Sequence, residues 1–445
     1  MKRYTEYKDS GVEWLGQIPQ HWKETKLKFI GYLYSGLTGK KGEDFANEKN
    51  SSNRPFIPFT NIASNEKIDV SALQYVRIED NEEQNLVKKG DLFFMMSSEN
   101  YDDVGKTTIL LNEVGEVYLN SFCRGFRITD STIDPSFLNY VLLSSPNRQR
   151  LLIEANGFTR INLKVGKIND LKVFFPPLTN EQTQIAQYLD HKTSQIDKLI
   201  SDKEKLIELL NEERTVIINH AVTKGLNPEV PMKDSGIEWL GEVPEHWEVK
   251  KLKYLCSLIS EKKDDFEPEV IIALENIESW TGRITGSLDI NEVGSDLSLF
   301  RNGDVLFNKL RPYLAKAVLA NHDGACVGEL LVLRSTSEIM PEFLFRRMLS
   351  EIFISIIDGS TFGTKMPRAS WDKFISQLAV PICGIDEQKE IILFISNQEK
   401  RINNLLEKIQ QEIQLLKEYK TALISEVVTG KVDIRDELLK PGALT

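Results

Sequence analysis

The sequence predicts an α+β protein in which two mixed α/β domains, related by a pseudo-twofold axis, are separated by two long antiparallel coiled-coil helices. Three observations lead to this prediction. A heptad pattern of apolar residues occurs at 181–222 and again at 387–428. The segment 7–30 returns in closely similar form at 232–255. A strand-rich region of diverged sequence follows each copy of that segment and precedes each heptad stretch.

The first heptad stretch runs from Glu181 to Val222. Its apolar residues fall on one seam with steps that alternate between three and four, as in a coiled coil. The expected seam residues are Ile185, Leu189, Ile196, Leu199, Leu206, Leu210 and Ile217. A helix of about 40 residues would be roughly 60 Å long at 1.5 Å per residue.

The second heptad stretch, from Glu387 to Val428, lies 206 residues further along the chain. Its expected seam residues are Ile391, Ile395, Ile402, Leu405, Ile409, Leu416, Tyr419 and Leu423. A single amphipathic helix most often packs against its own domain. Two copies separated by a domain-sized segment favour pairing of the helices with each other, and a twofold relation between equivalent units makes that pair antiparallel.

The repeated segments, which we call the first Trp-Pro segment (7–30) and the second Trp-Pro segment (232–255), read YKDSGVEWLGQIPQHWKETKLKFI and MKDSGIEWLGEVPEHWEVKKLKYL. The repeated residues include Trp14, Pro19, His21 and Trp22 in the first segment and Trp239, Pro244, His246 and Trp247 in the second. A packing clamp explains this pattern better than a binding site, because indoles bury large areas and proline fixes the turn between them.

Between each Trp-Pro segment and its helix, short matches connect the two diverged regions. Gly90-Asp91 corresponds to Gly303-Asp304 before an apolar strand, and Pro135 corresponds to Pro341 at the start of a helix. The repeated unit is therefore Trp-Pro segment, globular domain and helix. The expected boundaries are a first domain at 1–180, a first helix at 181–224, a second domain at 225–386, a second helix at 387–430 and a tail at 431–445.

The two helices also end alike, at Val222-Thr223 and Val428-Thr429. The first helix continues into the second Trp-Pro segment, and the N-terminus of the chain lies just before the first Trp-Pro segment. We therefore expect a nearly cyclic arrangement with both termini close together.

Composition supports several domains but does not by itself reveal a partner. A chain of 445 residues exceeds the size of one hydrophobic core. The net charge of −11 argues against a polyanionic partner, but the charge is segregated. Acidic residues gather at 79–116. Basic residues gather at Arg124, Arg127, Arg148, Arg150, Arg160, Lys164, Lys167 and Lys172.

The usual signatures of catalysis and of metal binding are missing from the sequence. No GxxxxGK[ST] loop, GxGxxG fingerprint or HExxH motif occurs. The four cysteines are scattered, which favours buried reduced thiols over zinc or disulfides. The sequence has neither an apolar run of membrane-spanning length nor the hydrophobic region of a signal peptide. We expect a noncatalytic, cytoplasmic protein without a cofactor or metal of its own.

Candidate nucleic-acid-binding residues lie in loops that combine cations with an amide or an aromatic ring. Arg can bond guanine bidentately, Asn can bond adenine, and Lys contacts phosphate, although most such clusters are ordinary solvated loops. The candidates in the second half are Asn308, Lys309, Arg311, Tyr313, Lys365 and Arg368. Those in the first half are Lys40, Lys41, Arg124, Arg160 and Lys164.

The repeated pattern SGxEWLGxxPxHW, the Glu-Gln starts of both helices, the twofold repeat and the ending VVTGKVDIR together resemble the specificity subunit of type I restriction-modification systems. The resemblance covers nearly the whole chain. It implies that each domain is a target-recognition domain that reads half of a bipartite double-stranded DNA target. The segments NKLRPYLAK and KMPRASW are similar to a common class of these domains.

The resemblance also implies partners. The coiled coil would set the spacer between the half-sites and dock two modification subunits, which carry S-adenosylmethionine and methylate adenine N6. Two restriction subunits that use ATP and magnesium would complete the complex. The main alternative is a noncatalytic coiled-coil adaptor that binds proteins at both ends, and a second is a standalone nuclease or methylase.

Overall fold

The computed structural model describes residues 2–46, 53–79, 81–155, 157, 160–261, 270–286, 297–363 and 365–435. Of the expected tail at 431–445, residues 436–445 therefore lie outside the described part of the chain. Contacts divide the chain into a first unit, Met1–Asp202 with Gln411–Thr445, and a second unit, Lys203–Gln410. Each unit contains one globular domain and a part of each long helix.

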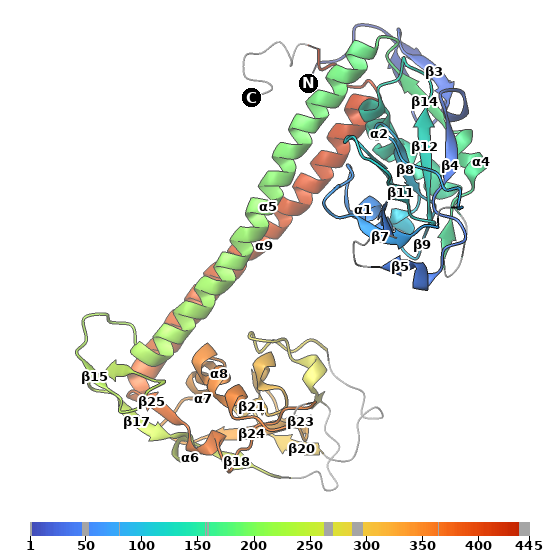
Figure 1. Cartoon of the computed structure of the whole chain (residues 1–445). Coiled ribbons are helices and arrows are strands. Elements are labelled where there is room, and N and C mark those ends of the chain that lie inside the picture. The colour runs from blue at the N-terminus through green and yellow to red at the C-terminus, as the bar shows by residue number, and fades with distance from the viewer. Residues whose placement is uncertain are drawn as a thin grey trace. The chain divides into compact units, whose positions relative to one another are not determined.

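The two long helices expected from the heptads are present as α5 (Thr179–Lys224) and α9 (Ile385–Val428). They pack together, and Figure 1 shows them side by side. In the first unit the Lys420 ammonium pairs with Asp197 at 2.8 Å, and in the second unit the Arg401 guanidinium pairs with Glu213 at 3.3 Å. From the first of these pairs to the second, the residue number in α9 falls from 420 to 401 while the residue number in α5 rises from 197 to 213. The helices are therefore antiparallel, as predicted.

The predicted seam of α5 is only partly right. Ile185, Leu189, Ile196 and Leu210 are buried, but Leu199 and Leu206 are 44% and 43% exposed. Ile200, one residue after Leu199, is buried instead at 9% exposure. Steps of three then four and of four then three have the same mean spacing, so periodicity alone could not decide which alternate position faces the partner.

The same shift occurs in α9. Ile391, Ile395, Ile402, Ile409 and Leu423 are buried as expected, whereas Leu405 and Tyr419 are exposed. Ile413, which the seam prediction omitted, is buried. Each helix consequently carries exposed apolar side chains on a face that its partner helix does not cover.

The domain of the first unit is built from antiparallel strands and short helices. One sheet has the strand order β10-β8-β12-β4 and another the order β11-β6-β7-β5, in which β11 and β6 are parallel. The strands are β1 (Tyr7–Asp9), β2 (Gln17–Pro19), β3 (Lys23–Lys26), β4 (Gly31–Ser35), β5 (Phe45–Ala46), β6 (Asn53–Ile57), β7 (Gln74–Arg77), β8 (Leu92–Met95), β9 (Ser97–Ser98), β10 (Thr107–Ile109), β11 (Tyr118–Leu119), β12 (Cys123–Ile128), β13 (Ile161–Asn162) and β14 (Lys172–Phe175). The shorter helices are α1 (Phe59–Ser64), α2 (Pro135–Leu143), α3 (Ser145–Ile153) and α4 (Val165–Asn169).

The domain of the second unit repeats the main sheet of the first, but its second sheet is assembled differently. Its main sheet has the order β18-β24-β21-β22, and a second has the order β19-β23-β20 with β19 and β23 parallel. The strands are β15 (Met232–Asp234), β16 (Glu242–Pro244), β17 (Glu248–Lys251), β18 (Cys256–Ile259), β19 (Ile271–Ile272), β20 (Leu297–Phe300), β21 (Val305–Asn308), β22 (Ala317–Leu319), β23 (Gly324–Val327), β24 (Leu330–Ser335) and β25 (Ala379–Ile382). The shorter helices are α6 (Leu252–Leu255), α7 (Pro341–Met348) and α8 (Glu351–Gly359).

Both Trp-Pro segments form a small hairpin and a strand that pairs with the last strand of the same domain. β1 pairs with β2 and β3 with β14 in the first unit, and β15 with β16 and β17 with β25 in the second. Trp22 and Trp247 are fully buried, as the packing-clamp prediction requires. Trp14, by contrast, is exposed.

The Glu-Gln pair at the start of each long helix joins that helix to its domain. The buried Gln182 side chain accepts from the Asp134 N–H and donates to the carbonyl oxygens of Thr132 and Pro176. The preceding Glu181 lies 3.1 Å from the His21 imidazole of the first Trp-Pro segment. The repeated sequence therefore fixes where each domain meets its helix.

The second unit makes the equivalent contacts. Gln388 accepts from the Met340 N–H and donates to the carbonyl oxygens of Glu338 and Cys383. Glu387 lies 2.8 Å from the His246 imidazole of the second Trp-Pro segment.

The segment that follows α9 lies against the first Trp-Pro segment and the residues before it, as the cyclic arrangement predicts. The Asp433 N–H donates to the carbonyl oxygen of Lys2 at 2.9 Å, and the Tyr7 hydroxyl donates to that of Gly430 at 3.0 Å. Gly430 has a positive φ of 73°, and a Cβ there would collide with Pro19.

Candidate nucleic-acid interface

The second domain joins its two predicted loops into one surface. One loop, 308–316, connects β21 to β22, and the other, 365–369, approaches it through a bridge between Leu310 and Arg368. The Arg311 N–H donates to the Pro367 carbonyl oxygen at 2.8 Å, and the Ala369 N–H donates to the Lys309 carbonyl oxygen at 2.9 Å. Residues that the sequence separates by more than fifty positions thus lie side by side.

Asn308 shapes this surface and does not project from it. Its side chain is buried, and both of its polar atoms bond to the backbone of Leu310, Nδ2 to the carbonyl oxygen at 2.6 Å and Oδ1 to the N–H at 2.9 Å. An amide that is occupied in this way supports the loop. It leaves recognition to neighbouring side chains.

Four predicted residues lie exposed on this surface: Arg311, Tyr313, Lys365 and Arg368. Arg368 is paired with Glu329, and the half-buried Lys309 donates from Nζ to the Gly328 carbonyl oxygen at 2.6 Å. Within the described ranges the Arg311 guanidinium has no polar partner, so it is available to a ligand.

The first domain has a surface at the equivalent position, but with different chemistry. β8 and β21 both follow the Gly-Asp turn, so the segment after β8, residues 96–101, corresponds to the 308–316 loop. β9 pairs with β13 there, Ser98 opposite Ile161 and Ser97 opposite Asn162. Sequence reasoning missed the polar residues Ser97, Ser98 and Asn100, although aligning Gly90-Asp91 with Gly303-Asp304 would have located them.

Of the five residues predicted in the first domain, Arg160 lies closest to this surface in the chain. Its guanidinium stacks on the exposed Phe122 ring at 4.7 Å from the centroid, and it immediately precedes β13. Lys164 is exposed just before α4, and Arg124 is half-buried in β12. Arg160 and Phe122 together form a flat cationic and aromatic surface suited to stacking on bases.

Lys40 and Lys41 belong to another part of the first domain. The Lys40 side chain is only 5% exposed and pairs with Glu82 at 2.6 Å, so its charge is neutralised within the protein. Lys41 is exposed beside it. The adjoining Thr38 N–H donates to the Gln84 side chain, which ties the segment to residues 82–84.

Two arginines that could have been DNA contacts are structural instead. Arg127 forms a two-bond pair with the buried carboxylate of Asp91, and Arg334 forms the same pair with Asp304. Hydrogen bonding to these carboxylates raises the pKa of both guanidinium groups. In each domain, the aspartate of the Gly-Asp turn therefore forms an ion pair with an arginine of the neighbouring strand in the main sheet.

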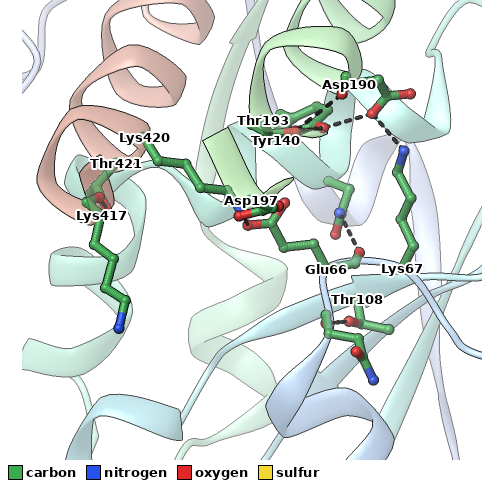
Figure 2. A network of polar contacts seen from close by, with 12 residues as sticks. Glu66, Lys67, Thr108, Tyr140, Asp190, Thr193, Asp197, Lys417, Lys420 and Thr421 are labelled. Carbon is green, nitrogen blue, oxygen red and sulfur yellow. Dashed lines mark hydrogen bonds and ion pairs between the residues drawn. The ribbon is translucent and has the colours of Figure 1, made fainter. Parts of the chain in front are cut away.

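In the first unit, charged side chains bind the domain to the helices (Figure 2). Lys420 of α9 reaches both Glu66, in the loop after α1, and Asp197 of α5, at 2.8 Å each. Burial alone would lower the pKa of Lys420, but the two carboxylates outweigh it and raise that pKa. The ammonium thus joins three segments of the chain.

A second part of this network lies closer to the start of α5. Asp190 accepts from the Tyr140 hydroxyl at 2.6 Å and pairs with the Lys67 ammonium at 2.8 Å (Figure 2). In the second unit the corresponding attachment is simpler. Arg346 of α7 forms a half-buried, two-bond pair with Glu399 of α9.

Features of other functional classes do not appear in the described part of the chain. No group of three or more His, Cys, Asp or Glu side chains there could hold a metal ion. The four cysteines are free and buried, as predicted, and burial raises the pKa of the Cys123, Cys256 and Cys326 thiols to about 12. Among the helices that the structure describes, none is long and apolar enough to cross a membrane.

The known proteins that are similar to this chain include specificity subunits of type I restriction enzymes. The profile of the type I restriction modification DNA specificity domain matches residues 19–209. The type I restriction enzyme EcoDI specificity subunit of Escherichia coli is 26% identical over 66% of this chain and 71% of its own. The MjaVIII specificity subunit of Methanocaldococcus jannaschii is 24% identical over 94% of this chain and 95% of its own.

The fold also matches a solved structure. A chain from a structure described as the basis of complex assembly and conformational transition of the type I R-M system has 12% sequence identity. It superposes with a TM-score of 0.69, covering 93% of this chain and 99% of that chain. The match supports the α+β architecture of two mixed domains linked by paired long helices.

Proposed function

Because this chain belongs to the family of type I restriction-modification specificity subunits, we propose that each of its two domains reads one half of a bipartite DNA target. The family's subunits confer DNA specificity and are themselves noncatalytic. One observation carries the proposal: two domains with the same strand order in the main sheet present loops of different chemistry at the same position. Two domains that share the main sheet but carry different loops are suited to reading two different half-sites. The site of action is the cytoplasm, where the DNA is.

The recognition domains in this proposal are residues 1–180 and 225–386, and the helical segments are 181–224 and 387–430, followed by the tail at 431–445. In the second domain, Arg311, Tyr313, Lys365 and Arg368 face the DNA, with Lys309 supporting them and Asn308 holding the loop. In the first domain the contacts come from Arg160, Arg124 and Lys164. Lys41 adds a contact from another part of that domain, where the charge of its neighbour Lys40 is neutralised by Glu82. The charges of these loops attract phosphate, and their side chains reach base edges.

The helices set the spacer and bind the modification subunits, in this proposal through the apolar side chains that the partner helix leaves uncovered. In the first unit these are Leu199, Leu415 and Tyr419. In the second unit they are Leu206, Leu209, Val216 and Leu405. Exposed apolar stripes of this kind mark interaction surfaces. Two modification subunits would bring S-adenosylmethionine for adenine-N6 methylation, and two restriction subunits would bring ATP and magnesium.

The proposal is tested by DNA binding of the complex of this chain with its modification subunits, measured from low to high salt. Neutralised phosphates release counterions, so the affinity should fall steeply, with a log–log slope of about −0.9 for each phosphate contact. Changing either half of the target should weaken binding separately. Binding that ignores both salt and sequence would favour the protein adaptor, and turnover by the isolated chain would favour a standalone enzyme.

A further inference from the structure

Backbone strain in the second domain is concentrated at one place. Among all the residues that the structure describes, the only non-glycine residues with positive φ are Trp280 (66°), Arg311 (51°) and Ala315 (46°). Arg311 and Ala315 flank the 3₁₀ turn η6 (Pro312–Leu314) in the 308–316 loop. The Trp280 N–H donates to the Ala315 carbonyl oxygen at 2.9 Å, which joins the third strained residue to that loop.

Left-handed backbone is unusual for a bulky residue and carries an energetic cost at each position. Such strain persists only where the surrounding structure overdetermines it, and it gathers at functional sites. The Trp280 hairpin meets this condition. Ile277 bridges to Ile284, and the Glu278 N–H donates to the Arg283 carbonyl oxygen at 2.9 Å.

Gly282 fixes the hairpin from the other side. Its φ is 69°, and a Cβ at this position would collide with the Phe345 ring of α7 and approach the Ala317 carbonyl oxygen. The backbone of the hairpin thus packs closely against Phe345 and Ala317. Trp280 lies at the tip of this hairpin, where its N–H is bonded to the Ala315 carbonyl oxygen.

The Trp280 side chain is not used to build the core. It is 40% exposed, whereas Trp247 in the same domain is fully buried. The loop to which Trp280 is bonded carries the exposed Arg311 and the exposed Tyr313. A rigid, exposed indole beside cations can stack on bases or act as an apolar wedge between base steps.

The first domain lacks this arrangement. The segment that follows Asn61-Ile62 corresponds to the one that follows Asn276-Ile277, but it contains Glu66 and Lys67 in place of an aromatic residue. Those two side chains bind Lys420 and Asp190 on the helices. In the first domain this loop therefore binds the domain to the long helices, whereas in the second domain it carries an exposed indole.

We propose that Trp280 inserts between base pairs of the half-site read by the second domain and unstacks one base step. The inference rests on the proposed function and adds a residue and a mode of DNA deformation to it. An adenine must leave the helical stack before its N6 can be methylated, and a step that is already opened lowers the cost of that extrusion. Because the corresponding loop of the first domain, residues 61–68, contains no aromatic residue, this insertion is expected at one half-site only.

The test uses the complex of this chain with its modification subunits and target duplexes that contain 2-aminopurine at successive positions. Unstacking raises the fluorescence of this base. The wild-type complex should give an increase at one step of the second half-site, and Trp280→Phe should retain most of it. Trp280→Asn should abolish it, because Asn tolerates the left-handed backbone but supplies no ring to stack. Affinity for the target should fall by about 5- to 150-fold in the Asn variant.

Two outcomes would overturn the inference. One is a Trp280→Asn complex that keeps both the fluorescence increase and the affinity. The other is an equal loss of signal at both half-sites, which would indicate a general defect. The proposed function fails separately, if the wild-type complex does not distinguish its target from a scrambled duplex of the same length.

Discussion

The two domains share a frame but differ in almost everything attached to it. Both have the same order of strands in the main sheet, the same Gly-Asp turn closed by an arginine, and the same glutamine at the foot of the helix. Their loops and their contacts with the helices differ. The repeated residues therefore support the structure, whereas the diverged residues at equivalent positions are the candidates for DNA recognition.

The largest expected effect concerns the buried tryptophans of the two Trp-Pro segments. Trp22→Ala and Trp247→Ala should each lower the free energy of unfolding of their own domain by about 3–5 kcal/mol, because each removes a fully buried indole. Hydrogen exchange followed separately in the two domains would measure this.

Phenylalanine variants of the same two tryptophans would measure the contribution of the indole hydrogen bond to stability. The Trp247 Nε1–H donates to Glu387 at 3.0 Å, whereas the buried Trp22 Nε1 has no partner among the described residues. Trp247→Phe should therefore cost about 1 kcal/mol more than Trp22→Phe. Equal costs would show that this hydrogen bond contributes nothing.

Removing the arginine from the two buried Asp–Arg pairs should lower the free energy of unfolding by different amounts. Among the described residues, Arg334→Met leaves the Asp304 carboxylate, whose side chain is 2% exposed, with only the Arg301 N–H as a hydrogen-bond donor. A buried charge stranded in this way costs about 3 kcal/mol. Chemical denaturation with the exposed Arg301→Met as the control would measure the loss.

Arg127→Met should be milder than Arg334→Met. The Asp91 carboxylate keeps the Tyr34 hydroxyl at 2.6 Å and the Lys88 N–H at 2.8 Å. We expect a cost smaller than that of Arg334→Met by about 1.5 kcal/mol, the contribution of one hydrogen bond to a charged group. A larger cost for Arg127→Met would reverse this ranking.

The smallest expected effect is a pH dependence confined to the first unit. The pKa of Lys420 is raised in the folded protein. Its contribution to stability is therefore fully present below the ordinary lysine pKa of about 10.4 and is lost as the pH rises through the higher folded value. Near-ultraviolet circular dichroism from about pH 9 to about pH 12 should show that Lys420→Met lacks this component. Identical titrations of the wild type and the variant would contradict the network in Figure 2.

Sequence reasoning predicted the frame well because its residues repeat. The heptads, the Trp-Pro segments and the Gly-Asp turn each occur twice, and each has a counterpart in the structure. The seam was wrong at Leu199 and Leu405, since a mean spacing cannot choose between adjacent positions on a helix. Trp280 could not be identified from composition, because a loop's role depends on which distant segment it contacts. Ser97 was missed for another reason, since an alignment of the two Gly-Asp turns locates it.

The ionic partners of the charged side chains also could not be predicted from the sequence. Lys40 looked like an exposed cation, but its partner Glu82 lies more than forty residues away and is brought close only by folding. Arg311 and Arg368 were predicted together. Only the structure shows that Arg368 is in an ion pair, whereas the Arg311 guanidinium has no polar partner among the described residues.

The most direct test of the central claim is long-read sequencing of N6-methyladenine in host DNA, with and without the gene for this chain. The wild type should produce a bipartite motif with a fixed nonspecific spacer that disappears with the gene. Arg311→Ala should change the bases of one half only, and Lys233→Ala, an exposed lysine of the second Trp-Pro segment, should leave the motif intact. A contiguous motif, or a change in both halves from Arg311→Ala alone, would contradict the account.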